Sequence, residues 1–242
     1  MNNNKETKIE TKTETKKEEP KQGWLLTYAD MMTLLFAFFV MMYSMSSPDP
    51  VKMSQIQDAM QKEAGKEGTI QSQHEIKQEF EKIVEELDIQ DVANVIEDPR
   101  GVALEMEGDI CFSSGSTEIK PTLKAVLNTA AKKILSNEQD YRMVIIEGHT
   151  DNAPIPQQLK KIYPTNWELS AARASKVVNY LINNSVNSGR LQASGYADRW
   201  PSGIPWHDIR SGTVDDTMIA EYNNTEDKKK QNRRIKIVFT NN

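Results

Sequence analysis

One carboxylate stands inside an otherwise apolar run of the sequence, where its surroundings suit proton or ion binding. Asp30 lies between Trp24 and Tyr43, a stretch in which only Thr27 and Thr33 are also clearly polar. Burial among apolar groups disfavours the charged form of a carboxyl, so Asp30 could take up and release a proton. A carboxylate in an apolar helix is costly and usually marks a function. We therefore take Asp30 as the candidate ion-binding residue.

The positions three and seven residues from Asp30, on the same helical face, carry short side chains. They are Thr27, Thr33 and Ala37, while Leu26 and Leu34 stand four residues from Asp30. Short side chains let two helices approach closely, so this face suits a partner helix and is expected to border an ion pathway. One helix cannot enclose a pathway by itself, so conduction requires other subunits. The competing interpretation is a carboxylate that reaches the membrane surface or pairs with a basic residue of another chain.

Residues 23–46 are predicted to form a single transmembrane helix. Twenty helical residues rise about 30 Å, which matches the hydrocarbon thickness of a bilayer. Trp24 and Tyr43 stand at the two ends, where amphipathic rings favour the interface, and Pro48 follows. A cleaved signal peptide and a buried core helix are the alternatives. The long charged leader and Asp30 argue against the first, and apolarity on all sides argues against the second.

The residues around this helix predict its orientation. Residues 1–22 are a run of Lys, Glu, Thr and Asn, which we expect to be a disordered cytoplasmic tail. Six lysines precede the helix, whereas Lys52 and Lys62 are the main basic residues just after it. The positive-inside rule therefore places the N-terminus in the cytoplasm and the rest of the chain outside the cytoplasmic membrane.

Two helical patterns follow the membrane segment. Within residues 47–70, Met53, Ile56 and Met60 recur at helical spacing and predict a short amphipathic helix followed by a linker. Residues 71–98 are expected to be a linker helix, because an apolar stripe runs along their first part. That stripe suits either packing onto a core or a dimer interface.

Residues 99–242 alternate strand and helix patterns and predict an α/β sandwich, with a mixed sheet and helices on one face. The expected strands span residues 102–106, 109–112, 141–147, 191–196 and 234–239. The expected helices are one that starts at Pro121 and one that spans residues 167–182.

The membrane segment carries Trp24, the triplet Tyr28-Ala29-Asp30 and Thr33 in an order that resembles the MotB family. MotB proteins are the ion-carrying subunits of the flagellar motor stator. The resemblance implies that Asp30 binds the transported ion, a proton rather than sodium by the form of the triplet, and that no cofactor is needed. It also implies a homodimer inside a ring of MotA-like subunits. The three apolar positions within residues 47–70 would form a plug against ion leakage.

Five short motifs of the C-terminal part resemble the OmpA-like peptidoglycan-binding domain in their order. They are Phe112-Ser113-Ser114-Gly115-Ser116, Gly148-His149-Thr150-Asp151-Asn152, Asn166-Trp167-Glu168-Leu169-Ser170-Ala171-Ala172-Arg173-Ala174, Gly195-Tyr196-Ala197-Asp198 and Asn232-Arg233-Arg234. The resemblance implies a domain that anchors the chain to peptidoglycan outside the inner membrane, in the periplasm or its equivalent.

The resemblance also implies a ligand, the diaminopimelate of peptidoglycan, whose free ammonium and carboxylate sit on one carbon. Asp151 matches the carboxylate that binds the ammonium, and Arg173 matches the guanidinium that grips the carboxylate. Asn166 and the loop at Thr150 would add hydrogen bonds. The alternatives are that Asp151 caps a turn and that Arg173 makes a surface ion pair of little energetic value.

The sequence departs from the OmpA pattern in its last part. Residues 201–222 are an insertion, and Lys228 and Lys229 stand where family members often have Gly-Arg. The shape of that loop is therefore left open. Arg233 and Arg234 are expected to stabilise the domain, and a role in ligand binding is left open for them.

Composition and residue spacing argue against several other classes of protein. A net charge of −5 argues against a nucleic-acid partner. Cys111 is the single cysteine, so it cannot form an intramolecular disulfide and is expected to be a buried apolar residue. No histidine spacing suits a metal, and no paired acids or Cys–His pair indicate a hydrolase, so we expect no enzyme. An ion-conducting stator subunit and a non-conducting OmpA-like wall tether remain, and Asp30 discriminates between them.

Overall fold

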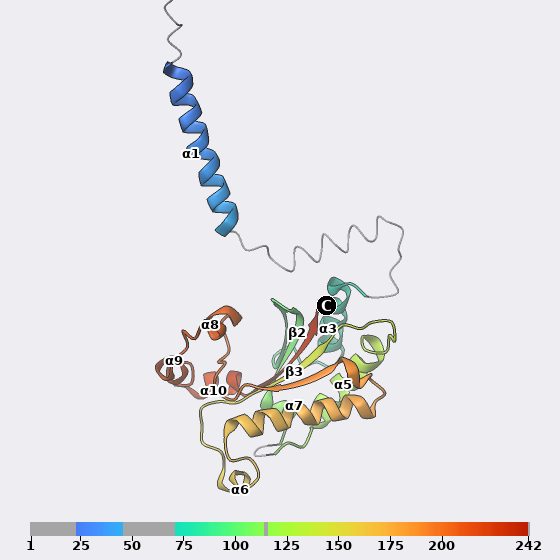
Figure 1. Cartoon of the computed structure of the whole chain (residues 1–242). Helices are drawn as coiled ribbons and strands as arrows, with labels where there is room; N and C mark the ends of the chain where they lie inside the picture. The colour runs from blue at the N-terminus through green and yellow to red at the C-terminus, as the bar shows by residue number, and fades with distance from the viewer. Residues whose placement is uncertain (1–22, 46–70, 114–115, 242) are drawn as a thin grey trace, which may run out of the picture. The chain divides into compact units, whose positions relative to one another are not determined.

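The computed structural model describes residues 23–45, 71–113 and 116–241, which form two separate units. The first contains α1 (Gly23–Met45), a helix of 23 residues and about 34 Å (Figure 1). All of its described side chains are exposed, including those of its large apolar residues. Among the described residues, α1 is the one helix long and apolar enough to cross a membrane, as predicted. The expected plug residues Met53, Ile56 and Met60 lie outside the described residues.

The second unit is built on a five-stranded mixed sheet with the strand order β1-β2-β5-β3-β4 (Figure 1). The strands are β1 (Ala93–Asp98), β2 (Gly101–Glu107), β3 (Val144–His149), β4 (Leu191–Gly195) and β5 (Arg234–Thr240). Only β3 and β4 pair in parallel, and the other neighbouring pairs are antiparallel. A parallel pair requires a crossover connection, and here it contains the long helix α7 (Asn166–Asn183).

Three helices cover one face of this sheet and bury the core with it, which confirms the predicted fold class. They are α3 (Gln73–Glu86), α5 (Pro121–Lys133) and α7. The alternation in β2 explains the choice of face, because Val102, Leu104 and Met106 are buried in the core whereas Glu105 points to the other side. Shorter helical segments complete the unit: α4 (Gly108–Cys111), α6 (Gln157–Lys160), η1 (Ser188–Arg190), α8 (Trp206–Ser211), α9 (Asp216–Glu221) and α10 (Glu226–Asn232).

The linker helix expected over residues 71–98 is instead two elements, α3 and β1. Ser72 begins α3 with a capping box. The Ser72 hydroxyl accepts from the Glu75 backbone N–H, and the Glu75 carboxylate accepts from the Ser72 backbone N–H. The apolar stripe of α3 packs into the core, where Ile76 and Phe80 are buried. The stripe therefore serves core packing, and α3 belongs to the domain.

The strand expected at residues 109–112 is wrong. Residues Gly108–Cys111 form the single helical turn α4, and only Phe112 makes an isolated β-bridge, with Ile119. A run of only three apolar residues occurs in a helical turn as readily as in a strand, so the short pattern could not discriminate. Cys111 is fully buried in this turn, and burial raises the pKa of its thiol to about 12.

The opposite face of the sheet is charged and is covered by Trp200, which is buried. The charged residues on this face or packed against it include three acids and three bases that pair with one another: Asp98, Glu105, Glu147, Arg100, Arg234 and Lys236. Arg100 and Lys236 both lie over the Trp200 ring, 5.6 and 5.4 Å from its centroid. The opposite charges are equal in number, which lets the layer be buried without an excess charge.

Candidate functional site

The four residues predicted to bind a zwitterion line one pocket in the second unit. The pocket has a volume of about 450 Å³ and lies among α4, the loop that follows β3, and the start of α7. Thr150 and Asp151 come from the loop, while Asn166 and Arg173 come from α7. The sequence motifs thus converge in space, although they are separated along the chain.

Arg173 supplies a positive charge to this pocket. Its Nε donates to the Ser116 carbonyl at 3.2 Å, and its guanidinium lies 5.2 Å from the centroid of the Phe112 ring. Burial lowers the pKa of Arg173, yet an arginine keeps its charge in proteins. The backbone carbonyl and the ring hold the side chain in place without neutralising it. The remaining donors of the guanidinium can therefore serve a carboxylate.

Asp151 supplies the negative charge, on a loop that is fixed from several directions. Its Oδ1 accepts from the Ala153 backbone N–H at 3.1 Å, and its Oδ2 accepts from Nη1 of Arg233 at 2.7 Å. The Asn166 amide nitrogen donates to the carbonyls of Asp151 and Ala153, both at 3.2 Å. Asn166 therefore holds the loop in shape. The Thr150 hydroxyl is buried and has no hydrogen-bond partner among the described residues.

Two motif glycines bring α7 close enough to the sheet to place Arg173. A side chain at Gly148 in β3 would collide with the Ser170 carbonyl, and one at Gly195 in β4 would meet the Ala171 backbone nitrogen at 2.6 Å. Ser170 itself is buried, and its hydroxyl accepts from the Ala197 N–H at 3.1 Å. Helix and sheet therefore approach to backbone contact at this end of the pocket.

A chain of asparagine side chains connects the pocket loop to the insertion of residues 201–222. Oδ1 of Asn223 accepts from the Asn152 backbone N–H at 3.3 Å and from the Asn232 amide at 2.9 Å. Oδ1 of Asn232 accepts in turn from the Ser202 N–H at 2.7 Å. The insertion, which forms α8 and α9, is thus joined to the segment that carries Asp151.

Three charged residues of the pocket were not predicted as ligand contacts from the sequence. They are Asp109, Lys120 and Arg233. Arg233 was expected to stabilise the domain, with a ligand role left open, and it contacts Asp109 at 3.2 Å as well as Asp151. Lys120 donates to the Asp109 carbonyl at 2.6 Å. The available signal was the Asn232-Arg233-Arg234 motif, which gave no sign of which arginine faces the pocket.

Comparison with known proteins matches both units of the chain. Residues 8–63 match the family model described as "Membrane MotB of proton-channel complex MotA/MotB", and residues 111–203 match the OmpA family. The chain is thus similar to MotB proteins in its membrane segment and to the OmpA family in its C-terminal domain. The MotB match contains Asp30, and the OmpA match contains Thr150, Asp151, Asn166 and Arg173.

Two relatives match this chain over about nine tenths of its length. The uncharacterized Bacillus subtilis protein YtxE is 28% identical over 91% of this chain and 89% of its own length. Motility protein B of the same organism is 22% identical over 90% of both chains. A solved MotB-like protein from Desulfovibrio vulgaris shares the fold, with a TM-score of 0.55 and 20% identity over 70% of this chain and 91% of that one.

The MotB-type helix α1 presents its carboxylate beside two threonines whose hydroxyls are already bonded. Thr27 donates to the Trp24 carbonyl at 2.9 Å, and Thr33 donates to the Asp30 carbonyl at 2.8 Å. Both hydroxyl donors are therefore satisfied within the helix, which suits packing in an apolar environment. Asp30, Thr27, Thr33 and Ala37 are all exposed on the isolated helix. This MotB-like chain is a membrane protein with an N-terminal apolar helix and an OmpA-like domain.

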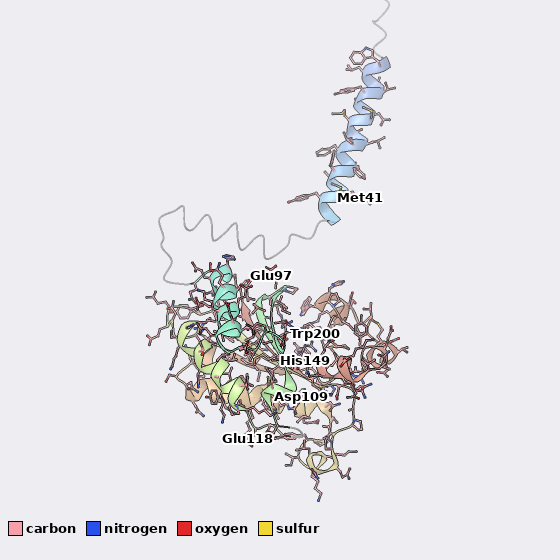
Figure 2. All side chains as sticks on the ribbon, turned by 180° about the vertical axis from the view of Figure 1, so that it is seen from behind. Met41, Glu97, Asp109, Glu118, His149 and Trp200 are labelled. Atoms are coloured by element: carbon pink, nitrogen blue, oxygen red, sulfur yellow. The ribbon has the colours of Figure 1, made fainter. Side chains whose placement is uncertain are left out.

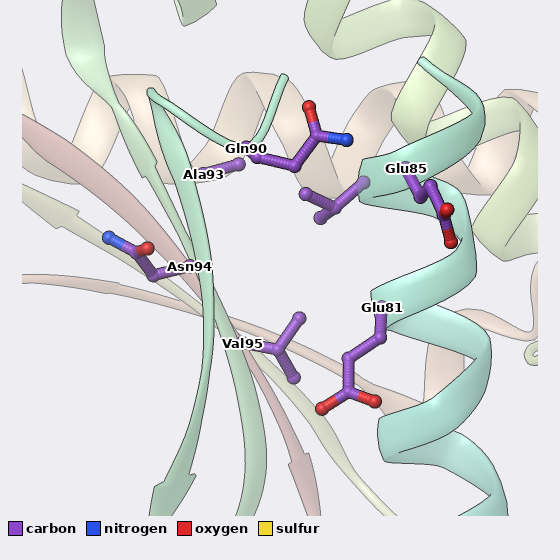
Figure 3. A pocket seen from close by; sticks show the side chains of 7 residues that line it. Glu81, Glu85, Gln90, Ala93, Asn94 and Val95 are labelled. Atoms are coloured by element: carbon purple, nitrogen blue, oxygen red, sulfur yellow. The ribbon is translucent and has the colours of Figure 1, made fainter. Parts of the chain in front are cut away.

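A second hollow in the OmpA-like domain has different chemistry. It is a shallow groove of about 450 Å³ between α3 and β1, lined by Glu81, Val84, Glu85, Gln90, Ala93, Asn94 and Val95 (Figure 3). Its charged residues are both acids, so it offers no cation for a carboxylate. The pocket at Arg173 is therefore the candidate site for a zwitterion.

The MotB-like and OmpA-like families are membrane and wall-binding proteins rather than enzymes, and this chain is not an enzyme. Within the described residues, no three His, Cys, Asp or Glu side chains are grouped so that they could hold a metal ion.

Proposed function

We propose that the OmpA-like domain binds peptidoglycan by gripping the zwitterionic end of diaminopimelate. The observation that carries the proposal is the presence of Arg173 and Asp151 in one pocket. Arg173 takes the carboxylate with two parallel hydrogen bonds, and Asp151 takes the ammonium on its unused lone pairs. The buried Thr150 hydroxyl offers a further hydrogen bond to either group.

Sedimentation of the full-length protein in detergent with peptidoglycan that contains diaminopimelate tests this proposal. We expect Arg173→Gln and Asp151→Asn each to weaken binding about 10-fold or more, because each leaves a ligand charge without its partner. Free meso-diaminopimelate should compete, whereas the analogue with carboxamides in place of its carboxylates should not.

Glu97→Gln is the matched control, since Glu97 forms an exposed ion pair with Lys77 away from the pocket. Undiminished sedimentation of both pocket variants would refute the proposed site.

We further propose that α1 conducts ions together with MotA-like subunits, as the stator subunit of a flagellar motor. The support is the MotB match over residues 8–63 and the single carboxylate, Asp30, on an exposed apolar helix. The transported ion is a proton rather than sodium, and no cofactor is involved. Two copies of the chain pair within a ring of MotA-like subunits in the inner membrane, with the N-terminus in the cytoplasm. Residues Met53, Ile56 and Met60 form the plug.

The alternative is a membrane-tethered wall anchor without ion transport. It shares the pocket and differs only in what Asp30 does. An ion flux that depends on Asp30 would establish the stator, whereas a flux that is the same in Asp30→Asn would leave the tether.

A further inference from the structure

Arg233 bridges two carboxylates at the edge of the pocket. Its Nη1 lies 2.7 Å from Oδ2 of Asp151, and its Nη2 lies 3.2 Å from Oδ2 of Asp109. The three side chains differ in access to solvent, with exposures of 27% for Arg233, 54% for Asp109 and 12% for Asp151. Arg233 is therefore placed to form an ion pair with either carboxylate.

The ion pair with Arg233 limits the hydrogen bonds that the Asp151 carboxylate can accept from a ligand. One of its oxygens already takes the Ala153 N–H, and the other takes Arg233. An ammonium that approaches Asp151 has to share this carboxylate with the guanidinium of Arg233, and the two positive charges repel each other. Arg173 has no such competitor, since its described partners are a carbonyl and an aromatic ring.

We propose that Asp109 is a specificity-determining residue, which holds Arg233 and so leaves Asp151 able to accept the ammonium of a zwitterion. This inference rests on the proposed binding of diaminopimelate. The lining includes three bases, Lys120, Arg173 and Arg233, and two acids, Asp109 and Asp151. Without the charge of Asp109, the lining keeps the negative charge of Asp151 and the positive charges of the three bases. The pocket then favours a plain carboxylate over a zwitterion.

A double-mutant cycle on the full-length protein in detergent tests the proposal, with meso-diaminopimelate as the measured ligand and calorimetry as the readout. We expect Asp109→Asn to weaken binding about fivefold or more, because Arg233 then turns fully to Asp151. In an Arg233→Gln background the same substitution should have little effect, since no competing guanidinium remains. Asp109→Glu should restore most of the binding.

Competition by pimelate separates the roles of charge and of shape. Pimelate carries both carboxylates of the ligand and no ammonium, so Asp109→Asn should leave its affinity unchanged or raise it. Glu97→Gln is the control for loss of one exposed acid. Thermal unfolding of each variant checks that the pocket is intact.

The outcomes distinguish this inference from the proposed function. If the unaltered protein binds meso-diaminopimelate and Asp109→Asn weakens binding equally with and without Arg233, the inference is wrong while the proposed ligand stands. An equal loss of pimelate and meso-diaminopimelate affinity would also overturn it. If the unaltered protein binds neither meso-diaminopimelate nor peptidoglycan, the proposed function itself fails.

Discussion

His149 is a buried imidazole among charged side chains, directly before the pocket residue Thr150. Its ring stacks on Tyr196 at 5.3 Å and meets Trp200 edge-on at 5.8 Å (His149 and Trp200 are labelled in Figure 2). Burial, together with the positive charge of Arg234, lowers the pKa of His149 to about 3. The imidazole is therefore neutral in the folded protein at neutral pH.

Glu147 is the acid nearest to this imidazole, with its Oε2 3.8 Å from Nε2 of His149. Burial alone would raise the pKa of Glu147, and contacts with His149 and Arg100 outweigh that effect and lower it to about 2. The Arg100 guanidinium lies 2.5 Å from its Oε1. Glu147 thus stays ionised at neutral pH while its histidine neighbour stays neutral.

We predict that the domain loses stability in two steps as the pH falls. Between about pH 6.5 and 3 the unfolded chain protonates His149 and the folded one does not, so protons favour unfolding. From pH 7 to pH 5 this contributes a loss of about 2 kcal/mol in the free energy of unfolding. Glu147 adds a second loss between about pH 4.5 and 2, because its pKa is depressed in the folded state. Urea unfolding of the full-length protein at several pH values measures both.

His149→Phe should remove the first step, since the ring stack is kept and the titrating group is lost. His207→Gln is the control for the loss of one exposed histidine. A profile of His149→Phe that still falls between pH 7 and 5 would show that another group carries the effect.

At the scale of elements, α3 is predicted to be essential for the stability of the OmpA-like domain. Phe80 on this helix is 1% exposed, in the core shared with the sheet. We expect Phe80→Ala to lower the free energy of unfolding by about 3–5 kcal/mol, because it leaves a cavity. Glu81→Ala on the exposed side of the same helix should change it by less than about 0.5 kcal/mol. Equal unfolding curves for the two variants would mean that α3 is only a linker.

The strong patterns of the sequence predicted most elements, and the weak ones failed for physical reasons. Pro121 does begin α5, and α7 follows its apolar periodicity over nearly the expected length. β1 was missed because it is an edge strand in which only Ala93 and Asp98 are buried, so it shows no alternation of apolar and polar residues. Residues 109–112 were too few for a period to be read at all.

Only those residues of the candidate site that lie within the family motifs could be predicted from the sequence. Asp151, Asn166 and Arg173 stand within recognisable motifs, and the fold brings them into one pocket. Asp109 and Arg233 stand far apart in the chain. They meet because Gly108 donates its N–H to the Arg233 carbonyl at 2.5 Å, where β2 ends and β5 begins. A contact of that kind depends on strand pairing, and the residue types Asp and Arg do not indicate which strands will pair.

At the scale of the whole molecule, the two proposed activities rest on different units. Asp30 belongs to the first unit, and Arg173 belongs to the second. A substitution at either residue should therefore remove one activity and leave the other. A passive tether needs only the second unit and a membrane anchor, whereas a stator needs both.

We predict that Asp30→Asn abolishes ion flux and leaves wall binding intact, while Arg173→Gln does the reverse. Flux is measured in cells that co-express the chain with its MotA-like partner, with residues 50–62 deleted to remove the proposed plug. A neutral amide cannot exchange a proton, so flux should fall to the level of cells without the chain. Repeating the measurement with and without sodium identifies the ion. Flux that is equal with Asp30 and with the Asp30→Asn substitution, in an assembled complex, would reject conduction through this carboxylate and favour the tether, because wall binding by Arg173 and Asp151 requires no ion to pass.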